Sequence, residues 1–82
     1  MTIYLDGRYM SDRKLAHDYL KTQLDLPDYY GRNLDALYDL LMEFSEPTSI
    51  VVQHQTEIYT EALLETLMDA ADNNPNLEIV TE

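Results

Sequence analysis

The strongest constraint on the fold of this 82-residue chain is the stretch Ser49-Ile50-Val51-Val52-Gln53. Its centre is an unbroken run of β-branched apolar residues, without the polar–apolar alternation of a strand that has one wet face. Such a run is typical of a buried parallel strand. Parallel strands need long crossover connections, so we expect helices before and after this stretch.

Two other stretches favour strands. Residues 2–5 are followed by the turn Asp6-Gly7, and residues 77–80 follow the helix-breaking segment 73–76. The resulting order is strand, two helices, strand, helix, strand. This order predicts a small α/β domain of the three-layer type, with a three-stranded parallel sheet, about three helices and right-handed crossovers. We expect one domain over residues 1–82.

Three helices are predicted from apolar residues at helical spacing that follow a capping residue. The expected caps and helices are Ser11 before 12–24, Asn33 before 34–44, and Thr56 before 57–72. The expected buried stripes are Leu15, Tyr19, Leu20 and Leu24 in the first helix; Leu34, Leu37, Leu40, Leu41 and Phe44 in the second; and Ile58, Ala62, Leu64, Leu67, Met68 and Ala71 in the third.

The sequence offers little for catalysis or metal binding. It has no cysteine, no glycine-rich phosphate loop, no zinc-type spacing and no calcium loop. His17 is predicted on the polar side of the first helix, and His54 in a loop after the central strand. We therefore expect that the chain binds no cofactor and no metal, and that it is not an enzyme. A hydrolase that uses Asp35 and Asp39 as paired carboxylates stays an alternative.

We predict the cellular location and the oligomeric state of the protein from features that the sequence lacks. No apolar run approaches the roughly 18 residues that a membrane span needs. The start of the chain has no basic segment followed by an apolar one, so no signal peptide is predicted. The expectation is a cytoplasmic protein with no membrane partner, monomeric when free.

Charge is divided unevenly along the chain. There are 5 Lys and Arg residues against 16 Asp and Glu, a formal net charge of −11. All five basic residues lie at or before Arg32, whereas residues 33–82 carry acids and no Lys or Arg. Such a chain should avoid nucleic acid, because phosphate binding needs cations. It should favour a basic protein partner, which it would meet rapidly through electrostatic steering.

The candidate site lies in residues 26–41, a loop that runs into the second helix. Asp35 and Asp39 lie four residues apart on the polar face, where their repulsion costs an isolated helix roughly 0.2–0.5 kcal/mol. Tyr29 and Tyr38 add broad, stiff contact area. Gly31 is expected at a backbone position that a side chain would not tolerate. This composition favours a binding surface that mimics nucleic-acid phosphates and targets the basic active site of a ribonuclease or another nucleic-acid enzyme.

The segment Tyr-Tyr-Gly-Arg-Asn-Leu-Asp-Ala-Leu-Tyr-Asp over residues 29–39 resembles the signature of the barstar family of ribonuclease inhibitors. The resemblance extends more weakly over the whole chain. It implies a three-stranded parallel sheet and an intracellular inhibitor of a small, basic, secreted microbial ribonuclease. The second helix and the loop before it would plug the enzyme's active site, with Asp39 as the central phosphate mimic. The implied partner-binding residues are Tyr29, Gly31, Asn33, Asp35, Tyr38, Asp39, Met42, Glu43 and Asp69.

Some positions depart from the family pattern. Tyr38 stands where the family more often shows Trp, and Met42-Glu43 where smaller residues are familiar. Asp69 is shorter than the expected Glu. The chain is also shorter between the second strand and the last helix, which predicts that a family helix is missing or merged there. These departures leave open an acidic interaction module that binds a basic partner other than a ribonuclease.

Overall fold

Three parallel strands form the sheet of the computed structural model, which describes all 82 residues. They are β1 (Thr2–Asp6), β2 (Thr48–Gln53) and β3 (Leu77–Thr81), in the order β1-β2-β3. The central strand β2 pairs in parallel with both neighbours. This arrangement confirms the predicted parallel sheet and the central place of the apolar run in β2.

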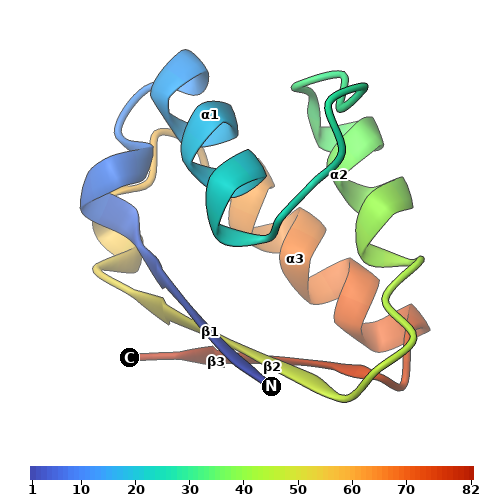
Figure 1. The fold of residues 1–82 in the computed structure, drawn as a ribbon. Helices are drawn as coiled ribbons and strands as arrows, with labels where there is room; N and C mark the ends of the chain where they lie inside the picture. The colour runs from blue at the N-terminus through green and yellow to red at the C-terminus, as the bar shows by residue number, and fades with distance from the viewer.

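Three α-helices cover one face of this sheet (Figure 1). They are α1 (Arg13–Gln23), α2 (Leu34–Leu41) and α3 (Glu61–Asn73). The number of helices matches the prediction, but the elements form two layers instead of three. Right-handed crossovers that step in one direction along a sheet place their helices on the same face.

The opposite face of the sheet carries a short apolar row made of Tyr4, Val51 and Val80, which lie in register on the three strands. Tyr4 is 55% and Val80 38% exposed, whereas Val51 between them is 9% exposed. Ile50 and Val52 point to the helical side and are fully buried. The apolar run in β2 is therefore buried on one face by the helices and on the other face by the side chains of the neighbouring strands.

The core lies between the sheet and the helices, but the third helix begins later than predicted. Thr60, and not Thr56, caps α3, and its hydroxyl accepts a hydrogen bond from the Ala62 backbone N–H. Residues 55–57 form only a short 3₁₀ helix, η2 (Gln55–Glu57), in the segment where a family helix was expected to be missing or merged. The α3 residues that the core buries are Leu63, Leu67 and Ala70, while Ala62 and Met68 are exposed.

The first two helices also differ from prediction at their ends. The Asp12 carboxylate caps α1 by accepting from the Leu15 backbone N–H at 2.9 Å, so Ser11 is not the cap. Leu15, which was predicted to be buried, is exposed, and His17, which was predicted on the polar side, is buried with 1% of its surface exposed. Helix α2 ends at Leu41 and not Phe44, because the next backbone bonds reach back only three residues.

A close contact between backbones joins the two short 3₁₀ helices, η1 (Gly7–Met10) and η2. Gly7 is buried against the carbonyl group of His54, at the end of β2. A Cβ atom on Gly7 would overlap the His54 carbonyl oxygen and lie 2.8 Å from its carbonyl carbon. Only glycine fits this contact without a backbone shift. None of the helices combines the length and apolar character that a membrane crossing requires.

Candidate functional site

The loop before α2 is held in shape by Asn33. Its side-chain oxygen accepts from the Ala36 backbone N–H at 2.7 Å, and its amide nitrogen donates to the Gly31 carbonyl at 3.3 Å. Asn33 is therefore the helix cap that the sequence predicts. Because one side chain bonds both the loop and the helix, the loop enters α2 in a fixed direction.

Gly31 does not occupy the strained backbone position predicted for it. The left-handed conformation falls on the next residue, Arg32, with φ of 52°. A Cβ atom on Gly31 would meet the Asn33 amide nitrogen at 3.2 Å and the Ala36 Cβ at 3.5 Å. The nearer atom is the end of a side chain, which can yield a little. Gly31 thus leaves room beside the cap, and the constraint on it is weaker than expected.

Four of the sequence-predicted site residues line one shallow hollow. Tyr29, Gly31, Asp39 and Glu43 surround a volume of about 240 Å³ between the loop and α2. Tyr29 is 76% exposed, so its ring stands free for contact with a partner. The hollow thus combines an exposed aromatic ring with two carboxylates, a composition suited to recognition of a basic, partly apolar surface.

A line of carboxylates, which we call the acid line, runs along the exposed side of α2 and into the turn that follows it. It consists of Asp35, Asp39 and Glu43, spaced four residues apart, and all three are exposed. Asp35 lies in the first turn of the helix, where the dipole favours a negative charge. Asp39 lies in the last turn, because α2 ends at Leu41, and there the dipole disfavours it. The helix therefore carries the Asp39 charge at a cost to its own stability.

Tyr38 connects the acid line to α3. Its hydroxyl accepts a hydrogen bond from the Asn73 side-chain amide at 3.0 Å, and the same amide donates to the Asp69 carbonyl at 3.0 Å. The structure therefore brings Tyr38 and the end of α3 that carries Asp69 together. Asn73 was not predicted as a site residue. Its position four residues after Asp69, on the same side of the helix, was the available signal.

Met42 is a predicted site residue that also has a structural role. It is the C-cap of α2, is half-buried and packs against the core cluster. Only part of its side chain is therefore open to a partner.

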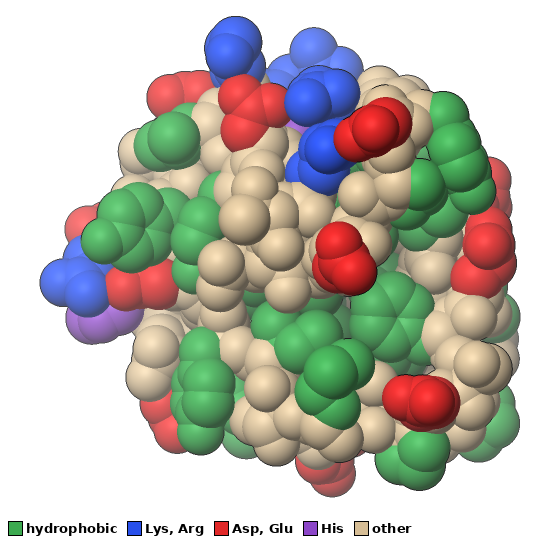
Figure 2. Space-filling view, in the orientation of Figure 1, with side chains coloured by type: hydrophobic (Ala, Val, Ile, Leu, Met, Phe, Trp, Pro, Cys, Tyr) green, Lys and Arg blue, Asp and Glu red, His purple; other side chains and the backbone are tan.

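No basic side chain neutralises the candidate site. The four ion pairs of the chain are Arg8–Asp6, Lys14–Asp18, Arg32–Asp18 and Lys21–Asp28. All of them lie within residues 6–32, so the acid line and Asp69 have no ion-pair partner. In Figure 2 most of the Lys and Arg side chains gather at the top and another lies at the left edge, whereas none is seen on the right, where α2 lies. The α2–α3 surface therefore presents a field of one sign.

A buried hydrogen bond ties the loop to α1. The Tyr30 hydroxyl lies 2.6 Å from His17 Nδ1, and both residues are almost fully buried. Burial raises the pKa of Tyr30 to about 12, and burial together with the charges of Arg13 and Arg32 lowers the pKa of His17. The sequence signal for a buried His17 was its spacing of three and seven residues from Leu20 and Leu24, which face the core.

The buried neutral His17 predicts a loss of stability in acid. Its folded-state pKa is below the ordinary 6.5, so the unfolded chain binds more protons once the pH falls through that value. We expect the free energy of unfolding of the parent to decline more steeply below pH 6.5 than that of a His17→Gln variant. Urea unfolding at several pH values measures both profiles. Parallel profiles from pH 7 to 5 would contradict this assignment.

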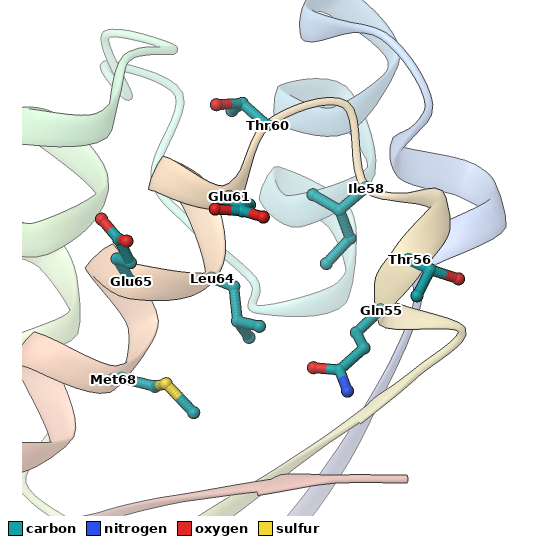
Figure 3. Close-up of a pocket in the computed structure, with 8 residues that line it drawn as sticks. All are labelled: Gln55, Thr56, Ile58, Thr60, Glu61, Leu64, Glu65 and Met68. Atoms are coloured by element: carbon teal, nitrogen blue, oxygen red, sulfur yellow. The ribbon is translucent and has the colours of Figure 1, made fainter.

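A separate cavity of about 400 Å³ lies between η2 and the start of α3 (Figure 3). Ile58, Leu64 and Met68 supply its apolar lining, and Glu61 and Glu65 are among its polar residues. None of the sequence-predicted site residues lines it. In the whole chain, no three or more His, Cys, Asp or Glu side chains gather where they could hold a metal ion.

Comparison with known proteins relates the chain to a protein family and to a curated bacterial protein. The family model described as Barstar (barnase inhibitor) matches residues 1–81. A protein of Bacillus subtilis (strain 168) named "Putative ribonuclease inhibitor YrdF" is 39% identical over 77 residues, which cover 85% of each chain. Both matches extend well beyond the loop and α2.

Proposed function

This chain belongs to the barstar family, and we propose that it inhibits a small basic ribonuclease of the secreted microbial type by plugging its active site with α2 and the preceding loop. The observation that carries the proposal is the acid line on a capped helix, without a single Lys or Arg in ion-pair contact. Unpaired carboxylates on a rigid element suit an active site whose catalytic groups are basic. The chain would act by binding alone, without catalysis.

Each site residue has a part in this proposal. Asp39 would take the position of an RNA phosphate among the Arg, Lys and His side chains of the enzyme. Asp35 would extend the contact along the helix, and Asp69 would do so from α3. Tyr29 would pack against the enzyme at the edge of the hollow. Since Asn33 already fixes the loop and Tyr38 is hydrogen-bonded to Asn73, little conformational entropy would be lost on docking.

A second function fits the end of the acid line. Met42 and Glu43 are where the chain departs from the family pattern, and Glu43 lines the hollow beside Asp39. An altered rim would suit a basic protein other than a ribonuclease. A panel of small microbial ribonucleases, each assayed with and without the purified protein, separates the two functions. Stoichiometric inhibition of at least one enzyme supports the inhibitor, and no inhibition across the panel supports the interaction module.

Association with a basic ribonuclease should depend strongly on salt. The steering charges are exposed, and the Debye length falls from about 10 Å at 0.1 M to about 3 Å at 1 M ionic strength. We expect the association rate constant to fall by about tenfold or more over that range, with a smaller change in the dissociation rate constant. Stopped-flow mixing measures the association rate. A rate that does not change with salt would point to an apolar interface.

A further inference from the structure

A cavity of about 360 Å³ at the start of α1 is lined by basic side chains. We call it the basic cavity, and the residues that line it are Arg13, Lys14, His17 and Arg32. They include three of the five Lys and Arg residues in a chain of net charge −11. Most of the Lys and Arg side chains visible in Figure 2 lie at the top, where Figure 1 places α1. The basic cavity is thus the opposite in charge to the acid line.

His17 supplies a buried polar atom with no partner. His17 is one of the residues that line the cavity and is 1% exposed, and its Nε2 has no hydrogen-bond partner within the protein. The buried Tyr30 hydroxyl has His17 Nδ1, 2.6 Å away, as its only side-chain partner. We assign the hydroxyl as the donor, because its O–H would otherwise be buried without an acceptor. This assignment leaves the ring proton of neutral His17 on Nε2. Nε2–H is therefore a buried donor that lacks an acceptor, which is a costly arrangement in a folded protein.

The cations around His17 exceed the acids that could neutralise them. Asp18 is shared between Lys14, at 3.1 Å from Nζ, and Arg32, at 2.9 Å from Nε. Arg13 makes no ion pair, and its guanidinium donates only a long bond of 3.5 Å to the Arg32 carbonyl. Of these three cations, only Lys14 and Arg32 pair with a carboxylate, and both pair with Asp18. Arg13 and Lys14 also begin α1, where the Asp12 carboxylate that caps the helix offsets part of the positive end of the helix dipole.

We propose that the basic cavity binds a small phosphate-type oxyanion, either inorganic phosphate or the terminal phosphate of a nucleotide. Phosphate brings acceptor oxygens to a site where His17 Nε2–H has none. The guanidinium groups of Arg13 and Arg32 match the geometry of phosphate oxygens, and Lys14 adds a mobile charge at the rim. Arg32 lines this cavity, while its neighbour Gly31 lines the hollow beside Asp39. The oxyanion site and the acid line therefore share one loop without sharing residues.

The test is a titration of the full chain with inorganic phosphate at pH 7. Sodium chloride holds the ionic strength constant, and NMR follows the His17 ring nitrogens and the Nε2 proton. We expect a saturable shift of these signals at millimolar phosphate. Arg13→Gln removes an exposed guanidinium without disturbing the core and should weaken binding by about tenfold or more. Lys21→Gln makes the same charge change outside the cavity, where Lys21 pairs with Asp28, and should leave binding unchanged.

The remaining outcomes are also decisive. Adenosine 5′-monophosphate replaces phosphate in a parallel titration: tighter binding assigns the site to nucleotides, and equal or weaker binding assigns it to free phosphate. The proposal is overturned if neither ligand gives a saturable shift, or if Arg13→Gln and Lys21→Gln weaken binding equally. Equal weakening would mean that phosphate responds only to the net charge of the protein.

Discussion

Replacing Asp39 by alanine should weaken inhibition of the cognate ribonuclease more than any other single change on α2. Truncating one member of a buried, hydrogen-bonded charge pair at an interface costs about 2–5 kcal/mol, which is roughly 30-fold to a few thousand-fold in the dissociation constant. Asp39 is the middle member of the acid line and lines the hollow with Tyr29. The measurement is the inhibition constant against a ribonuclease that the parent protein blocks.

The control for this change is Asp72→Ala. Asp72 is exposed on α3 and lines a different hollow, with residues of β3, so its loss removes the same charge away from the acid line. We expect Asp72→Ala to inhibit nearly as well as the parent, with a small decrease in association rate. If both variants inhibit equally, the total charge of the protein explains the inhibition, and phosphate mimicry by Asp39 is wrong.

Stability should respond to Asp39→Ala in the opposite direction from binding. Asp39 lies in the last turn of α2, where the helix dipole is negative, and it has no ion-pair partner. Its removal should raise the free energy of unfolding slightly, by about 0.3–1 kcal/mol. Stability and inhibition measured on the same sample separate a binding defect from a folding defect. A variant that loses both would leave the role of Asp39 in binding unsupported.

The sheet and the acid line could be predicted because their signals are local. The β-branched run at residues 50–52 specifies a buried strand wherever its neighbours lie, and two acids four residues apart share a helix face under any packing. The signal for the cap of α2 was also local, because the Asn33 side chain accepts a hydrogen bond from Ala36, only three residues later. Such features follow from a few consecutive residues, so the sequence alone sufficed.

The features that were missed depend on contacts between distant residues. His17 is buried because it meets Tyr30, thirteen residues later, and Tyr38 meets Asn73 across thirty-five residues. The start of α3 depends on His54, whose left-handed backbone (φ of 51°) turns the chain before Thr60 can cap the helix. Thr56 and Thr60 both have the chemistry of a cap, and only the tertiary fold selects between them.

Gly7→Ala is expected to cause the largest loss of stability among single additions of one methyl group. The new Cβ would overlap the His54 carbonyl oxygen, and both partners of this contact are backbone atoms that cannot rotate away. Relief requires η1 and the end of β2 to move apart, at a cost of about 3 kcal/mol. For a chain of this size, with a total stability on the order of 4–12 kcal/mol, that is a large fraction. Urea unfolding followed by circular dichroism measures the change.

Gly31→Ala is the matched control for this prediction. It adds the same methyl group at the only other glycine, where the nearest atom is the Asn33 side-chain amide at 3.2 Å. That amide can shift by a few tenths of an ångström, so we expect a loss below about 1 kcal/mol. A small loss at Gly7, or equal losses at both glycines, would mean that the η1–η2 contact yields easily.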